Sequence, residues 1–187
     1  MSETEVAQKV KILKLLVIFL PVQVTLLLSQ GVPDWFTDLV VETRSKHGLT
    51  TDEAYVTSLY EAIVDVSNRL GIDHLLMIAL ILAESEFRNV VGMHGELGLT
   101  QIKPETARFV CKIYNLNEPE DGWVRLLWDH RLNVEFGALY LKYHLERNNG
   151  NILKALEAYN GGNSRSSYAV KVLERYKELM NHSLADR

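Results

Sequence analysis

The chain has 187 residues, of which 47% are apolar and 24% are charged, with 20 Lys and Arg against 24 Asp and Glu. This composition is that of a globular protein and excludes a disordered chain or a collagen-like repeat, and the length predicts one domain around one hydrophobic core. The net charge of −4 at pH 7 argues against nucleic acid as a partner, because phosphate binding needs a basic surface. The single cysteine, Cys111, excludes an intramolecular disulfide and a multi-cysteine zinc site.

The first residues of the chain carry a disproportionate share of its hydrophobicity. Lysines within residues 9–14 precede the apolar run of residues 15–28. Ser29 and Gly31 then supply small residues at the two positions that a signal peptidase inspects, with cleavage expected before Val32. The run falls short of the roughly 20 apolar residues that span a bilayer comfortably. A cleaved signal peptide is the first interpretation, a retained membrane anchor the second, and a buried helix the third. We expect residues 1–31 to be a signal peptide or an N-terminal membrane anchor, and either would take the domain out of the cytoplasm.

The rest of the chain, residues 32–187, shows helical periodicity and no alternating strand pattern. Thr50 stands three residues before Glu53, which is the spacing of a capping box and predicts the start of a helix. Gly71 is a natural end for that helix.

The next predicted helix is the most apolar segment of this region. Asp73 is placed to cap it, and residues 75–83 are apolar on every side. A helix of this kind lies either in the centre of a core or in a membrane. Because nine residues are too few to cross a membrane, we predict a buried central helix.

The second half of the chain continues as helices separated by loops. Three glycines punctuate the segment around residues 92–98, Pro104 is placed to open the helix that follows, and residues 115–123 are typical of a surface loop. Further helices are expected over about residues 132–147, 152–159 and 167–181. The chain is therefore predicted to be all-α, with one globular domain of five or six main helices.

Glu84 is the first candidate functional residue, because it closes the apolar helix one turn after Leu80 and Ile81. Apolar neighbours disfavour the ionised form of a carboxyl group, so the pKa of Glu84 should be raised. A carboxylic acid that stays protonated near neutral pH can act as a general acid. The alternative is a solvated acid at a fraying helix end.

Three other features are candidates with structural alternatives. The glycines at 92, 95 and 98 are not a nucleotide loop, since no strand precedes them, and indicate either a close backbone approach to a ligand or to Glu84, or a plain turn. Tyr159 is either a core residue or a side chain whose hydroxyl reaches a reacting oxygen or a carboxyl group. Asn133 has low helix propensity within a predicted helix, which indicates a hydrogen-bonding role. Cys111 lies on an inward stripe and is expected to be inert.

Four segments carry these features in a fixed order: Glu84-Ser85 with Phe87; Gly98-Leu99-Thr100-Gln101 followed by Pro104-Glu105-Thr106-Ala107; Asn133, Gly137, Tyr140 and Leu141; and Ala-Tyr-Asn-Gly-Gly at residues 158–162. In order and spacing they resemble the catalytic domain of the soluble-lytic-transglycosylase type (SLT domain) of peptidoglycan enzymes, relatives of goose-type lysozyme. One segment alone would be weak, but four in register are specific. The resemblance covers about residues 68–180.

The resemblance implies a lysozyme-like domain whose buried central helix carries Glu84 as the single general acid and base. It implies cleavage of the β-1,4 bond between N-acetylmuramic acid and N-acetylglucosamine without water, which leaves 1,6-anhydromuramyl ends, and it implies no cofactor and no metal. The implied partners are peptidoglycan glycan strands, with envelope or secretion machinery as a further candidate, no nucleic acid, and a membrane only through the N-terminal segment. The implied substrate-binding residues are Gln101, Tyr159, Ser85, His94, Thr100 and Asn160, among which Ser85 and Asn160 are expected to be chiefly structural.

The chain departs from the family pattern at Thr100, where Met is usual, at Gly161, where Ala is usual, and at His94, where Ser is frequent. Two other functions stay open. A hydrolytic lysozyme would need a second carboxylate to position water, for which Asp129, Glu96 and Glu86 are candidates. A non-catalytic glycan-binding or envelope-assembly scaffold would need no acid at all.

Overall fold

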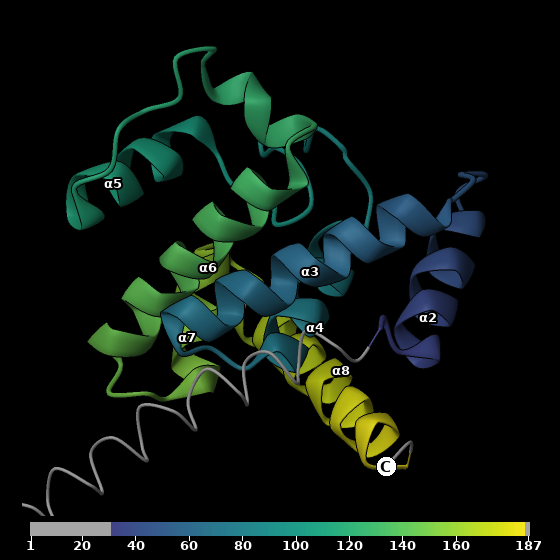
Figure 1. Ribbon diagram of the computed structural model, residues 1–187. Coiled ribbons are helices and arrows are strands. Elements are labelled where there is room, and N and C mark those ends of the chain that lie inside the picture. Colours follow the sequence, from purple (N-terminus) through teal and green to yellow (C-terminus); the bar gives the residue numbers. More distant parts are fainter. Residues whose placement is uncertain (1–30, 186–187) are drawn as a thin grey trace, which may run out of the picture. The chain divides into compact units, whose positions relative to one another are not determined.

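The protein is built from helices joined by loops, and its structure, a computed structural model, describes residues 31–185. The helices are α2 (Asp34–Ser45), α3 (Glu53–Leu70), α4 (His74–Glu84), α5 (Pro104–Tyr114), the 3-10 helix η1 (Trp123–Leu127), α6 (His130–Arg147), α7 (Ile152–Asn160) and α8 (Arg165–Ala185) (Figure 1). The predicted all-α class is confirmed. The described residues form seven α-helices instead of five or six, and α2 is the helix that the sequence pattern did not predict.

The predicted signal peptide or anchor, residues 1–31, lies outside the described residues except for Gly31. Residue contacts divide the chain into two units, Met1–Asp34 and Trp35–Arg187, and α3 to α8 all belong to the second. A search of the described residues finds no helix with the length and apolar character needed to cross a membrane.

The centre of the core is α4, as predicted. Its residues 75–81 are all buried, and it packs against α3 and α8 (Figure 1). The helix begins where Asp73 accepts a hydrogen bond from the backbone N–H of Leu75 at 2.8 Å. It ends at Glu84, so the last residue of the most buried helix is the candidate acid.

Three predicted helix starts are wrong by a few residues, those of α3, α6 and α8, of which α8 begins at Arg165 and not at about residue 167. The cap of α3 is Asp52, whose carboxylate accepts the N–H of Tyr55 at 2.7 Å, and not Thr50. Likewise α6 begins at His130 because Asp129 accepts the N–H of Leu132 at 2.9 Å. At α3 the Asp52 carboxylate interacts more favourably with the helix N-terminus than the Thr50 hydroxyl would, and at α6 the Asp129 carboxylate caps the helix before the predicted start. The predicted end of α3 is confirmed, since Gly71 takes a left-handed φ of 68°.

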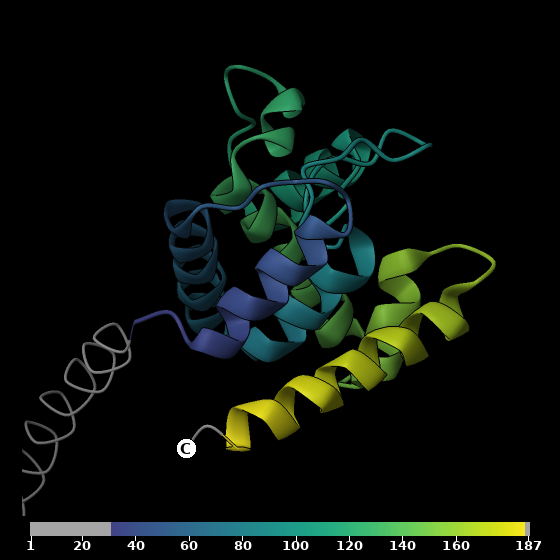
Figure 2. The same ribbon diagram turned by 90° about the vertical axis from the view of Figure 1, so that its right-hand side faces the viewer.

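Packing of the later helices brings two separate segments to one side of the domain. Helix α6 packs against α3, α5 and α7, while α7 and α8 pack against each other. Figure 2 shows the loop between α4 and α5 and the turn between α7 and α8 projecting from the same side. The site described next lies between this loop and this turn.

Candidate active site

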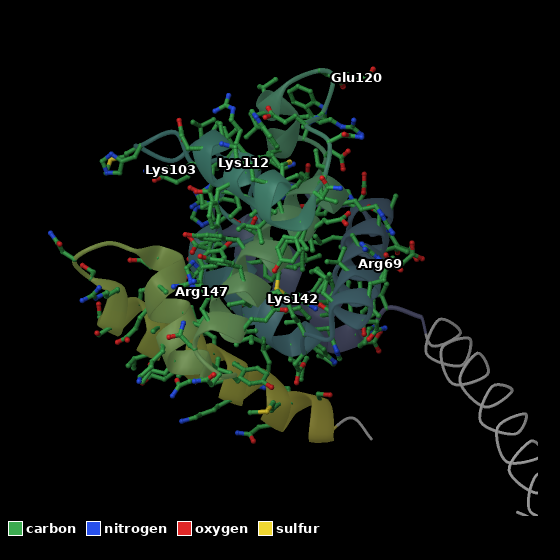
Figure 3. All side chains as sticks on the ribbon, turned by 90° about the vertical axis from the view of Figure 1, so that its left-hand side faces the viewer. Arg69, Lys103, Lys112, Glu120, Lys142 and Arg147 are labelled. Carbon is green, nitrogen blue, oxygen red and sulfur yellow. The ribbon has the colours of Figure 1, made fainter. Side chains whose placement is uncertain are left out.

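A cleft of about 530 Å³ lies between the α4–α5 loop and the α7–α8 turn. Its lining comprises Glu84 from the end of α4; His94, Glu96, Gln101, Ile102 and Lys103 from the loop; Thr106 from α5; Tyr140 from α6; and Tyr159, Asn160, Gly161 and Gly162 from the end of α7. Figure 3 shows Lys103 near the base of the projecting loop. Four of the sequence-predicted residues, Gln101, Tyr159, His94 and Asn160, therefore share this cleft with Glu84.

Glu84 is half-buried, and the pKa of its carboxyl group is raised, as its apolar neighbours predict. Burial raises the pKa of Glu84 from its ordinary value of 4.5 to about 7, against the opposing effect of a hydrogen bond from Tyr168. The negative charge of Glu96 adds to the rise, and the positive charge of Lys171 reduces it. A substantial fraction of Glu84 therefore keeps its proton at neutral pH and can donate it.

Tyr168 is a site residue that the sequence pattern did not predict. It lies in the first turn of α8, and its hydroxyl donates a hydrogen bond to Oε1 of Glu84 at 2.5 Å. No local pattern connects two residues that are 84 positions apart. Its helical position is consistent with this contact, because Tyr168 stands four residues before the buried Val172 and so lies on the same face of α8.

The α4–α5 loop is held by Asn133, a fully buried residue of α6. Its side-chain nitrogen donates to the carbonyls of Leu97 at 2.8 Å and Leu126 at 2.9 Å. Its side-chain oxygen accepts from the backbone N–H of Thr100 at 2.8 Å and from the Thr100 hydroxyl at 2.7 Å. The predicted hydrogen-bonding role of Asn133 is confirmed: three of the four bonds fix the loop that lines the cleft, and the fourth joins Asn133 to η1.

The loop glycines are explained by this packing and not by an approach to Glu84. A Cβ on Gly98, where φ is 71°, would collide with the Asn133 amide and with the carbonyl of Leu126. A Cβ on Gly92 would come within 2.6 Å of Oε1 of Gln101 and would also collide with Glu96. By contrast, Gly95 has open space around it and supplies only its positive φ of 84°.

Gln101 and Tyr159 line the cleft, but their polar groups are partly committed to the protein. Gln101 has an unusual positive φ of 50°, and its side-chain nitrogen donates to the carbonyls of Gly98 at 2.7 Å and Val90 at 3.1 Å. The Tyr159 hydroxyl donates to the carbonyl of Thr100 at 2.9 Å. The structure therefore agrees better with the expectation that Tyr159 is a core residue than with the expectation that its hydroxyl reaches a carboxyl group.

Ser85 and Thr100 do not line the cleft, so the structure does not support their predicted contact with substrate. Both are buried, with 1% and 0% of their surface exposed. The Ser85 hydroxyl donates to the carbonyl of Ile81 at 3.3 Å, and the Thr100 hydroxyl donates to the side-chain oxygen of Asn133 at 2.7 Å. Their polar groups satisfy the backbone and the loop, which makes them supports of the site.

The three acids considered for a hydrolytic mechanism lie in different places. Glu96 lines the cleft together with Glu84. Glu86 forms an ion pair with His47 at 2.5 Å, and Asp129 caps α6 and pairs with Arg125 at 2.9 Å. Only Glu96 of these three is a cleft residue.

The turn that follows Glu84 is held by groups from α2 and α3. Phe87 is fully buried at a positive φ of 58°. Its carbonyl accepts hydrogen bonds from Nη1 of Arg44 at 2.7 Å and from the hydroxyl of Tyr55 at 3.0 Å. Strained backbone of this kind persists only where its surroundings hold it, so these two donors stabilise the chain directly behind the candidate acid.

Within the part of the chain that the structure describes, no group of three or more His, Cys, Asp and Glu side chains could hold a metal ion. Cys111 is buried, and burial raises the pKa of its thiol. The predicted inert character of this cysteine agrees with both observations.

Comparison with known proteins places this fold and cleft in a family. Residues 61–179 match the Transglycosylase SLT domain, and the chain belongs to that family.

Solved structures agree with this assignment at the level of the fold. An inactive mutant of the lytic transglycosylase Slt from Pseudomonas aeruginosa matches with a TM-score of 0.57 and 21% identity, over 64% of this chain and 24% of that one. The 70-kDa soluble lytic transglycosylase from Escherichia coli matches with a TM-score of 0.50 and 23% identity, over 63% of this chain and 19% of that one. The same scores describe a 70-kDa soluble lytic transglycosylase in complex with bulgecin A. The chain thus spans less than a quarter of the length of these structures.

Proposed function

We propose that this protein is a peptidoglycan lytic transglycosylase with Glu84 as its single proton donor and acceptor. The observation that carries the proposal is the position of Glu84, which lies in the cleft at the end of the buried helix α4, where burial raises the pKa of its carboxyl group to about 7. The match of residues 61–179 to the SLT domain supports the substrate class.

The reaction needs one proton to move out of Glu84 and one to return. The Glu84 carboxyl donates its proton to the glycosidic oxygen between N-acetylmuramic acid and N-acetylglucosamine, and the bond from the anomeric carbon to that oxygen breaks. The resulting carboxylate then accepts the proton of the muramyl 6-hydroxyl, whose oxygen bonds to the anomeric carbon. The products are a free N-acetylglucosamine end and a 1,6-anhydromuramyl end, no water is consumed, and Glu84 is protonated again.

A pKa close to neutrality suits this double role. A group that must first give a proton and then take one back works best when neither state is strongly favoured at the working pH. Burial in the cleft supplies this balance for Glu84, because an exposed glutamate would be ionised at pH 7.

A hydrolytic lysozyme is the second candidate, and the position of Glu96 favours it. A carboxylate in the same cleft as a carboxylic acid is the arrangement that glycoside hydrolases use to activate water or to stabilise the sugar cation. The two functions differ in their products, since hydrolysis leaves reducing ends.

Removal of the acid separates both enzymes from a non-catalytic scaffold. Glu84→Gln is expected to lower the rate of sacculus digestion about 10²–10⁴-fold, because the amide cannot donate the proton. Glu86→Gln is the matched control, since Glu86 lies two residues away and pairs with His47 outside the cleft lining. Equal digestion by the wild type and Glu84→Gln would refute an enzymatic role for the site.

We further propose that residues 1–31 direct the protein out of the cytoplasm, to the periplasm or cell envelope, where its substrate lies. The basic residues and the apolar run of this segment support that proposal. N-terminal sequencing of the exported protein tests it: a chain that starts at Val32 indicates a cleaved signal peptide, and an intact Met1 indicates an anchor.

A further inference from the structure

Glu96 is an acidic residue of the catalytic cleft for which the single-acid reaction has no use. Of the residues that line the cleft, only Glu84 and Glu96 carry carboxyl groups. They come from different parts of the chain, Glu84 from the end of α4 and Glu96 from the projecting loop (Figure 2).

The loop holds the Glu96 carboxylate in a fixed place. Its Oε2 accepts a hydrogen bond from the backbone N–H of His94 at 3.0 Å, and its Oε1 lies 3.3 Å from Nζ of Lys103. Its side chain is 21% exposed, compared with 45% for the side chain of Glu86. Gly92 packs against the Glu96 side chain so closely that a Cβ there would collide with it. These contacts restrain both oxygens and leave little freedom for the side chain to turn away from the cleft.

The two carboxyl groups hold their protons differently. Burial acts to raise the pKa of Glu96, but the backbone N–H groups of Glu96 and His94 and the ammonium group of Lys103 outweigh it and lower that pKa. Burial raises the pKa of Glu84 to about 7. The pKa values of the two carboxyl groups are thus shifted in opposite directions, so at mildly acidic pH Glu84 keeps its proton while Glu96 is ionised, and such a separation marks carboxyl groups with different roles.

We propose that Glu96 is a fixed anion of the catalytic cleft, which stabilises the positive charge that develops on the sugar ring when Glu84 protonates the glycosidic oxygen. The proposal rests on the proposed function and extends it from one working carboxyl group to two. Glu96 forms no bond and transfers no proton in this role. Its charge acts at a distance on the ring, and it also favours the protonated form of Glu84.

The test is the pH–rate profile of Glu96→Gln on purified sacculi, beside the wild type. Glutamine keeps the shape of the side chain and an acceptor for the His94 N–H, and removes only the charge. At pH 5–6, where Glu84 is protonated in both proteins, kcat is expected to fall about 10- to 100-fold, in line with the loss of one electrostatic stabiliser.

The alkaline limb of the Glu96→Gln profile is expected to move to lower pH, because one cause of the raised Glu84 pKa is gone. The other groups around Glu84 remain: Tyr168 and Lys171 on α8, Tyr159 on α7, and His94 and Lys103 from the loop side of the cleft. Lys103 loses its ion-pair partner in this variant, and its unpaired positive charge moves the limb in the same direction. A purely structural role for Glu96 would lower the amount of folded protein without moving this limb.

Two variants serve as controls. Glu86→Gln removes the same charge two residues from Glu84 but outside the cleft lining, and should leave both kcat and the limb unchanged. Glu96→Asp keeps the charge on a shorter side chain, and should keep the wild-type limb even if its loop is less stable.

A folded Glu96→Gln protein with wild-type kcat at pH 5–6 would overturn the inference, whether or not its alkaline limb moves. That result differs from a failure of the proposed function, in which the wild type itself would release no muropeptides or Glu84→Gln would be as active as the wild type.

Discussion

The behaviour of Glu84 depends on a balance between its burial and a single tyrosine. Burial and the Glu96 charge raise the pKa of its carboxyl group, while the Tyr168 hydroxyl and Lys171 lower it. Because burial is the largest effect, the group stays protonated to about pH 7. Tyr168 also fixes Oε1 of Glu84 in one place, which orients the acid toward the cleft.

Tyr168→Phe tests this balance. Loss of a hydrogen bond that favours the charged carboxylate should raise the pKa of Glu84 further, so the alkaline limb of the pH–rate profile should move to higher pH. We expect kcat at pH 6 to fall about 10-fold as well, because the carboxyl group loses its orientation. The pH–rate profile on sacculi measures both effects.

Tyr176→Phe is the matched control on the same helix. The Tyr176 hydroxyl also donates to a carboxylate, that of Asp73 at 2.7 Å, but Asp73 lies at the opposite end of α4 from Glu84. This variant should keep the wild-type profile. An alkaline limb that moves to lower pH in Tyr168→Phe, or one that moves equally in both variants, would contradict the account of Glu84.

At the scale of elements, the site depends on how α6 holds the α4–α5 loop. The buried side-chain amide of Asn133 joins this loop to η1, because it donates hydrogen bonds to the carbonyls of Leu97 in the loop and Leu126 in η1. The glycine at position 98 is what lets the loop backbone reach that amide. The loop in turn carries Gln101, Glu96 and His94 into the cleft.

Gly98→Ala is therefore expected to destabilise the protein by about 3 kcal/mol, because the added methyl group meets Asn133 and Leu126 and the backbone must keep a positive φ. Gly95→Ala shares the positive φ but meets open space, so about 1 kcal/mol is expected. Urea unfolding of both variants measures the difference. Equal losses would show that the packing against Asn133 contributes nothing.

Sequence periodicity predicted those parts of the site that depend on local order. The apolar run of α4, its last residue Glu84 and the out-of-place Asn133 were all recognisable, because each is unusual within its own helix. The contact of Tyr168 with Glu84 was not, since it depends on how α8 packs against α4. Helix α2 was missed because it buries only Phe36, Val40 and Thr43, too few residues for a clear stripe.

At the scale of the whole molecule, the buried acid makes folding stability depend on pH. Folded Glu84 keeps its proton up to about pH 7, whereas in the unfolded chain it releases it near the ordinary value of 4.5. Between these two values the folded state binds more protons, so the contribution of Glu84 to stability falls as the pH rises. Above pH 7 the folded state bears the full cost of a buried carboxylate.

Glu84→Gln should remove this dependence. The variant is expected to be more stable than the wild type by about 2–3 kcal/mol at pH 8, and the difference should shrink toward zero near pH 4. Because other titrating groups such as His130 and His144 are common to both proteins, their effects cancel in the comparison. Urea unfolding of both proteins at several pH values measures the difference in their free energies of unfolding. A difference that does not change with pH would contradict a raised pKa for Glu84.

The mass of the new glycan ends tests most directly whether Glu84 cleaves the glycan without water. Sacculi digested by the wild-type protein in heavy-oxygen water should yield 1,6-anhydromuramyl ends, each lighter than a reducing end by one water molecule and free of the heavy isotope. Glu84→Gln should yield almost none of these ends. Reducing ends that carry heavy oxygen would contradict the account and identify the protein as a hydrolase.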